Sequence, residues 1–135
     1  MNTLNKLLDR SGPGLDLLAR LLLALIFIGA GWSKVGGYES TQGYMQAMGV
    51  PGALLPLVIV AELGGGLALL IGLLTRVAGL GLAVFSIVSA VIFHADFSNP
   101  VEQIMFMKNL AIAGGLLLIV AHGPGRLSLD ARLFR

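Results

Sequence analysis

Four long apolar stretches, separated by short polar joints, dominate the pattern of the chain. They cover about residues 15–35, 53–74, 77–94 and 104–122. Each stretch has about the roughly 20 residues that an α-helix needs to cross a bilayer. Helices satisfy their own backbone hydrogen bonds, which lipid cannot do. The pattern therefore predicts an all-α polytopic membrane protein with four transmembrane helices in one bundle, forming a single domain over residues 1–135.

The segments between and beyond these stretches are shorter and more polar. Residues 1–14 mix leucines with charges and predict a short helix on the membrane surface, with a disordered tail as the alternative. The tail at 126–135 predicts a second surface segment, and residues 36–49 predict a polar, glycine-rich loop. Only Thr75 and Arg76 separate the second and third stretches, so these helices are expected to be antiparallel neighbours.

Lysine and arginine lie mostly on one side of this topology. The ends and the second joint carry Lys6, Arg10, Arg76, Arg126, Arg132 and Arg135, whereas Lys34 and Lys108 belong to the other side. Short cytoplasmic segments carry the excess of basic residues. Both termini are therefore expected in the cytoplasm, and the protein in a bacterial cytoplasmic (inner) membrane.

Composition supports a membrane protein and excludes several classes of function. The chain is 56% hydrophobic and 12% charged, with mean hydropathy +0.90, whereas an ordinary soluble domain is about 25% charged. The net charge is only +2 and the basic residues are dispersed, which argues against a nucleic-acid partner. The absence of cysteine excludes disulfides, thiol nucleophiles and cysteine-ligated metals, so any redox chemistry must come from another molecule.

Polar residues within or beside the apolar stretches are the candidates for function. They are Arg20, Lys34, Glu62, His94, Lys108 and Asn109. A charge near the centre of a bilayer costs at least about 2.5–3.5 kcal/mol, so such residues usually face protein or water and find partners. We expect them to form an intramembrane polar cluster that could bind a ligand.

Helical spacing places these polar residues on faces that also carry small residues. The four predicted faces are Arg20, Ala24, Phe27, Gly31 and Lys34; Glu62, Gly65, Leu69, Gly72 and Arg76; Gly79, Ala83, Ser86, Ala90 and His94; and Lys108, Ala111, Gly115 and His122. Small residues let membrane helices approach closely, so these faces are expected to point inward.

Glu62 is expected near mid-membrane, within reach of Arg20 or Lys108. Two interpretations of these charges stay open. They could form a buried ion pair that locks the bundle, although such pairs are poor net stabilisers. Alternatively, they could line a polar pocket for a quinone or another small amphiphile.

Known catalytic and metal-binding patterns give no prediction here. His94 and His122 fall at opposite ends of their helices, about 30 Å apart, so they cannot hold one haem. No cluster of histidines and carboxylates has metal-ligand spacing, and no catalytic triad or phosphate-binding loop is apparent. We expect no metal, no assured cofactor and no catalytic residue in this chain.

Short motifs from Leu17 to Asp130 together resemble the DoxX-like family. They are Arg20 with the apolar run to Gly31 and Lys34, Glu62-Leu-Gly-Gly-Gly with Gly72 and Thr75-Arg76, Phe106-Met-Lys108-Asn109-Leu110, Gly114-Gly115 with Gly123-Pro-Gly125, and Ser128-Leu-Asp130. The resemblance implies a four-helix bacterial inner-membrane protein. Some members of that family are subunits of membrane-associated oxidoreductase assemblies, among them a thiosulfate to quinone system and a complex that links thiol and superoxide defence.

Three hypotheses about function follow from the residues and the resemblance. The first is a membrane subunit or anchor of an oxidoreductase assembly, without catalysis of its own, with a soluble oxidoreductase as partner and a quinone as the possible ligand. The second is a small solute or lipid binder or transporter, for which a narrow four-helix bundle would need a homo-oligomer. The third is a structural membrane protein with only an internal ion pair.

Overall fold

The computed structural model describes residues 1–134, and all regular secondary structure in that part of the chain is helical. The elements are α1 (Asn2–Gly36), α2 (Tyr38–Ala47), the 3-10 turn η1 (Gly52–Leu54), α3 (Leu55–Ile71), α4 (Thr75–Phe93), α5 (Pro100–His122) and α6 (Leu129–Leu133). Four segments are long and apolar enough to cross a membrane: α1, η1 with α3, α4, and α5. The all-α, four-span prediction is confirmed.

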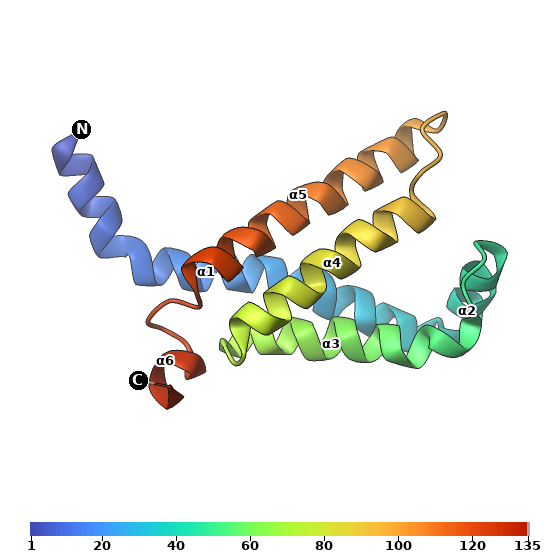
Figure 1. Ribbon diagram of the computed structural model, residues 1–135, viewed down its shortest axis with the longest axis horizontal. Helices are drawn as coiled ribbons and strands as arrows, with labels where there is room; N and C mark the ends of the chain where they lie inside the picture. Colours follow the sequence, from blue (N-terminus) through green and yellow to red (C-terminus); the bar gives the residue numbers. More distant parts are fainter. Residues whose placement is uncertain (135) are drawn as a thin grey trace.

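The bundle consists of two closely packed helix pairs, α1 with α3 and α4 with α5 (Figure 1). A tight turn between α3 and α4 joins the pairs, as the two-residue joint in the sequence predicts. Gly72 ends α3 in the left-handed conformation, with φ of 72°, and Leu74 follows with φ of 48°. Contact between α1 and α5 is slight. The side of the bundle on which these two helices face each other is here named the α1–α5 seam.

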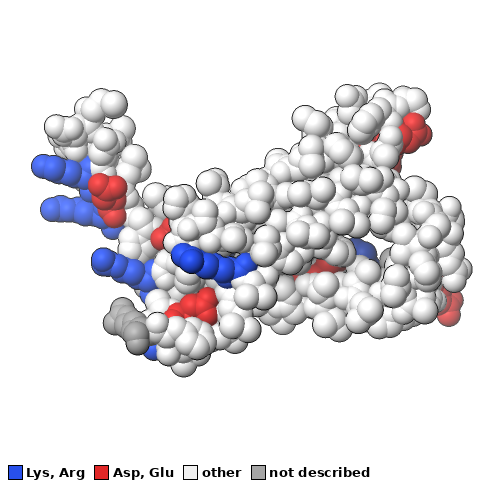
Figure 2. Space-filling model, in the orientation of Figure 1, with Lys and Arg blue, Asp and Glu red and all other residues white. Residues whose placement is uncertain are grey.

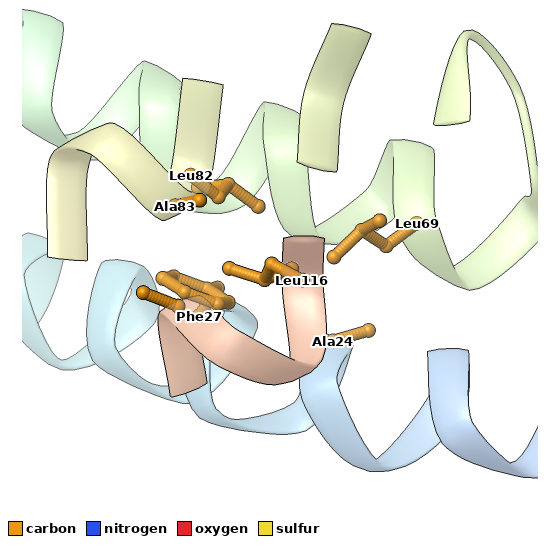
Figure 3. Packing of buried hydrophobic residues seen from close by; sticks show 7 residues of the cluster. Ala24, Phe27, Leu69, Leu82, Ala83 and Leu116 are labelled. Atoms are coloured by element: carbon orange, nitrogen blue, oxygen red, sulfur yellow. The ribbon is translucent and has the colours of Figure 1, made fainter. Parts of the chain in front are cut away.

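One apolar core holds all four long helices together (Figure 3). Its buried members are Ala24, Phe27, Leu69, Leu82, Ala83, Ala113 and Leu116. Opening this core would cost free energy, because its densely packed side chains would lose their van der Waals contacts. The core fills the middle of the bundle and fixes the helices on either side of it.

Glycines set the close approach of α1 and α3. A Cβ added at Gly31 would lie 2.7 Å from the Leu63 side chain, and one at Gly66 would lie 2.8 Å from the Ile28 side chain and 3.2 Å from the Ile28 backbone nitrogen. Membrane helices gain stability mainly from such close packing. These glycines therefore allow the polar side chains of the two helices to meet.

The first helix is longer than the sequence pattern predicts. Residues 2–14 are helical and continuous with the spanning part of α1, so no disordered tail occurs there. Pro13 lies inside this helix, and Figure 1 shows the first turns set at an angle to the rest and projecting beyond the bundle. A proline inside a helix removes one backbone hydrogen bond, and helices commonly bend where a proline occurs.

The predicted loop at 36–49 is wrong, because most of it forms α2. The hydroxyls of Ser40 and Thr41 donate to the Gly37 carbonyl, 3.0 and 2.8 Å away, and Glu39 lies in the first turn, where the helix dipole favours an acid. The glycines that suggested a loop mark only its boundaries and one exposed position.

The last spanning helix begins at Pro100, four residues before the predicted start at 104. The side chain of Asn99 accepts a hydrogen bond of 3.0 Å from the Val101 backbone N–H and caps the helix. Proline at the first position needs no hydrogen-bond partner for its nitrogen. The cap and the proline explain the earlier start. The hydrophobic pattern did not include this first turn because its residues are partly polar.

The C-terminal tail docks against the α3–α4 turn. The Asp130 carboxylate accepts hydrogen bonds from the backbone N–H groups of Leu74 and Thr75, at 2.7 and 2.9 Å, and so caps α4. Burial, the largest single effect, raises the pKa of Asp130, but these hydrogen bonds and the charge of Arg20 together outweigh it and lower the pKa below its usual value. The tail is thus an integral part of the fold.

Basic residues gather at the end of the molecule that carries both termini and the α3–α4 turn, here named the terminal end (Figure 2). The opposite end, named the α2 end, carries α2 and the loop at 94–99. Figure 2 shows the surface hollowed near the α2 end. The charge asymmetry agrees with the distribution on which the predicted orientation rests.

Candidate functional site

An ion pair that is buried on the Glu62 side joins α1 to α3 near the α2 end. The Lys34 ammonium lies 2.8 Å from Oε1 and 3.1 Å from Oε2 of Glu62. The Glu62 side chain is 4% exposed and that of Lys34 is 28% exposed. Glu62 was expected to pair with Arg20 or with Lys108, and both of these predictions are wrong.

The direction of side chains on antiparallel helices explains this pairing. Each Cα–Cβ bond tilts toward the N-terminus of its own helix. The Lys34 side chain, near the C-terminal end of α1, therefore points back into the bundle, and the Glu62 side chain points toward the α2 end. Position along the helix axis alone does not show these directions.

Five of the predicted polar residues line one small cavity, here named the polar cavity, of about 140 Å³. They are Lys34, Glu62, His94, Lys108 and Asn109. The Asn109 side-chain amide donates to the Ser86 carbonyl at 3.2 Å, which fixes α5 against α4. The Lys108 ammonium has only the thioether of Met105, at 3.4 Å, and no carboxylate within salt-bridge distance in residues 1–134.

A larger and mainly apolar cavity, here named the apolar chamber, adjoins the polar cavity. Its volume is about 370 Å³, and it shares Lys34, Glu62, Phe85, Ser89 and His94 with the polar cavity. Small-molecule sites are typically apolar spaces of about 300–1,000 Å³ with a few polar groups. The chamber therefore has the size and the composition of a site for an amphiphile.

Helix α2 contributes a wall of the apolar chamber that the sequence pattern missed. Thr41, Tyr44 and Met45 line it, and the Tyr44 ring lies 5.4 Å from the ring of Phe93 on α4. Aromatic pairs at this separation attract each other beyond their apolar burial. The spacing of Thr41, Tyr44 and Met45, three and four residues apart, was the signal for a helical face in the supposed loop.

His94 connects the two cavities to the surface of the α2 end. Its Nδ1 lies 2.7 Å from Oε2 of Glu102, whose side chain is 27% exposed. Glu102 stands in the first turn of α5, directly across the short loop from His94. A histidine at the end of one helix and an acid at the start of the next could have revealed this pair.

Arg20 does not belong to the site. It is 1% exposed and lies fourteen residues before Lys34 on the same helix, or roughly 21 Å along the axis. Its guanidinium donates to the carbonyl of Leu69 at 3.0 Å, to that of Leu70 at 3.3 Å, and to that of Leu127. Arg20 therefore ties α1 to the end of α3 and to the C-terminal tail.

The predicted inward faces of α1 and α4 agree with the burial, but that of α5 is wrong. Ala111 and His122 are exposed, whereas Ala113, Leu116 and Ile119 are buried. The helix is apolar around most of its circumference, so its small residues did not identify the packed face. Lys108 and Asn109 still reach the polar cavity from the edge of that face.

The family to which the chain belongs follows from its sequence relationships. The profile of the family described as DoxX matches residues 15–95, more than half of the 135 residues. The chain belongs to the DoxX family. The match includes the Lys34–Glu62 pair, His94 and the α2 wall of the chamber, whereas Lys108 and Asn109 lie beyond it.

Several curated relatives of this DoxX protein extend over nearly its whole length. The "Inner membrane protein YqjF" of Escherichia coli K12 is 54% identical over 87% of this chain and 90% of its own. The "Inner membrane protein YphA" of the same organism is 36% identical over 98% and 100%. Together with the four apolar helices, these relatives show a multi-pass protein of the inner membrane.

A more distant relative carries a name that refers to an activity. The "Putative oxidoreductase CatD" of Bacillus subtilis is 33% identical over 88% of this DoxX chain and 87% of its own. No solved structure matches the chain significantly.

Proposed function

We propose that this DoxX protein is a membrane subunit or anchor of an oxidoreductase assembly, and that it binds a quinone or a similar amphiphile in the apolar chamber. The observation that carries the proposal is that Lys34, Glu62 and His94, from three different helices, line a chamber that is otherwise mostly apolar. Lysine and histidine N–H groups donate to carbonyl oxygens such as those of a quinone. The printed name of the Bacillus subtilis relative supports the link to redox chemistry.

The chain itself offers hydrogen bonds, a shaped apolar space and exclusion of water. It has no cysteine, and among residues 1–134 no group of three histidines and carboxylates could hold a metal. Electron transfer to or from a bound quinone would therefore depend on a redox-active partner subunit. The role assigned to this chain is to hold and orient the amphiphile beside that partner.

The core favours binding over transport through the bundle. Phe27 belongs both to the wall of the polar cavity and to the apolar core. Leu69 and Leu116, both 0% exposed, fill the middle of the bundle beyond it (Figure 3). A solute crossing from the α2 end would have to separate all four helices.

Binding is tested with a substitution that fills the chamber and leaves the ion pair in place. Val58 on α3 lines the apolar chamber, whereas Val60 on the same helix is 66% exposed to the surroundings. In lipid nanodiscs supplied with a short-chain ubiquinone, V58W is expected to lose the bound quinone, and V60W is expected to retain it. Equal retention by both variants, measured by mass spectrometry of the extracted discs, would refute the chamber as the quinone site.

The assembly is tested in native membranes extracted with a mild detergent. We expect a redox-active subunit, identified by the visible spectrum of its flavin, haem or iron–sulfur centre, to co-purify with the chain. Quinone reduction by that complex should fall in V58W and stay normal in V60W. A chain that purifies without any redox centre from membranes active in quinone reduction would argue against the subunit role.

A further inference from the structure

The polar cavity carries one positive charge for which residues 1–134 provide no acidic partner within salt-bridge distance. Lys34 is paired with Glu62, and His94 is bonded to Glu102. Lys108, in contrast, is half-buried, and its ammonium contacts only a thioether sulfur among the described residues. Sulfur is a weak acceptor, and an ammonium inside a membrane is costly without a counter-charge.

The position of the polar cavity shows where a counter-charge could come from. The cavity is lined by residues of α1, α4 and α5 and by Glu62 of α3, and it lies on the side where α1 and α5 make little contact. Ile26 of α1 lines the cavity and is also 38% exposed. Because the exposed side chains of a membrane-spanning helix face lipid, the cavity reaches the lipid through the α1–α5 seam.

We propose that the polar cavity binds the phosphate of an anionic lipid, which enters through the α1–α5 seam and pairs with Lys108. The acyl chains lie along the apolar residues of the seam, and Phe27 closes the cavity toward the core. This lipid site adjoins the quinone site of the proposed function and shares lining residues with it, but the lipid phosphate lies beside Lys108 and Asn109, which do not line the apolar chamber.

The test compares two lipids that differ in the net charge of the headgroup. The full chain is purified, washed with detergent, and titrated with phosphatidylglycerol or phosphatidylcholine of identical acyl chains, and bound lipid is counted by native mass spectrometry. We expect the wild type to prefer phosphatidylglycerol by at least about tenfold, because the choline of phosphatidylcholine offsets the charge of its own phosphate, whereas the phosphate of phosphatidylglycerol is left to pair with Lys108. K108Q should lose this preference, and K108R should keep most of it.

K6Q is the matched control, because it removes the same charge from the exposed part of α1 and leaves the polar cavity intact. A wild type without preference, an unchanged preference in K108Q, or an equal loss in K6Q would each overturn the proposal. Addition of inorganic phosphate separates two sources of the same chemistry. Displacement of the lipid would assign the site to free phosphate, and its failure would assign the site to the lipid headgroup.

The outcome is distinguishable from that of the quinone experiment. K108Q is expected to retain ubiquinone as the wild type does, because Lys108 is outside the apolar chamber. Loss of the lipid preference in V58W would contradict the placement of the lipid phosphate beside Lys108, because Val58 lines only the apolar chamber.

Discussion

Replacement of Lys34 by methionine is expected to be far more damaging than neutralisation of its partner. K34M leaves the Glu62 carboxylate, 4% exposed, without its ammonium in the interior of the bundle. Removal of one partner of a buried ion pair costs about 3–5 kcal/mol, because the remaining charge is neither paired nor hydrated. We therefore expect K34M to lose about this much free energy of unfolding.

The reverse substitution, E62Q, should cost clearly less, about 1–2 kcal/mol. A glutamine carbonyl can still accept a hydrogen bond from Lys34. The Lys34 side chain is also 28% exposed and lies two residues from the end of α1, so its ammonium can turn toward water. The double variant K34M/E62L should recover most of the stability lost in K34M, since a buried pair replaced by apolar groups is often neutral.

The assay is reversible unfolding of the purified protein in mixed micelles, with helicity followed as the denaturing detergent fraction rises. The three free energies of unfolding are compared with that of the wild type. Equal losses in K34M and E62Q, or a double variant as unstable as K34M, would refute the account of a stranded buried carboxylate.

Three further predictions concern packing, the tail and the topology. G66A should cost about 1–3 kcal/mol in the same assay because its Cβ meets the backbone of α1, whereas G64A, with nothing within 4 Å, should be neutral or slightly stabilising. D130N should lose about 1 kcal/mol by weakening the cap of α4. The pKa of Asp130 is lowered in the folded protein, so the stability that its carboxylate adds is full above the usual pKa of 3.8 and declines as the pH falls below that value. The difference in stability between the wild type and D130N should therefore shrink in acid. With no native cysteine in the chain, an impermeant maleimide applied to intact spheroplasts should label Q103C but not N5C, and the opposite pattern would reverse the predicted orientation.

The sequence was sufficient to predict the four spans, because the thickness of the bilayer sets the number of consecutive apolar residues that a spanning helix needs. It was also sufficient to select Lys34, Glu62, His94, Lys108 and Asn109, since charged and polar groups are expensive in lipid and therefore stand out. These residues share a cavity because α1 and α3 are antiparallel and the α4–α5 loop is short.

The partners of these residues could not be predicted in the same way. The choice of Lys34 for Glu62 depends on side-chain direction and on the close packing at Gly31 and Gly66, which axial position does not describe. The role of Arg20 depends on three backbone carbonyls, which leave no signature in a sequence. The chamber wall from α2 depends on local capping within a segment that is rich in glycine.

The contact of Arg20 with the tail has a consequence for biosynthesis. Arg20 enters the membrane with the first helix, yet one of its acceptors, the Leu127 carbonyl, lies 107 residues later in the chain. The cap that Asp130 places on α4 arrives equally late. Before the segment around Leu127 is made, the guanidinium can use only the carbonyls of Leu69 and Leu70. Synthesis of residues 127–130 is thus the step that completes the terminal end, and a chain that stops before Leu127 would lack both of these late contacts.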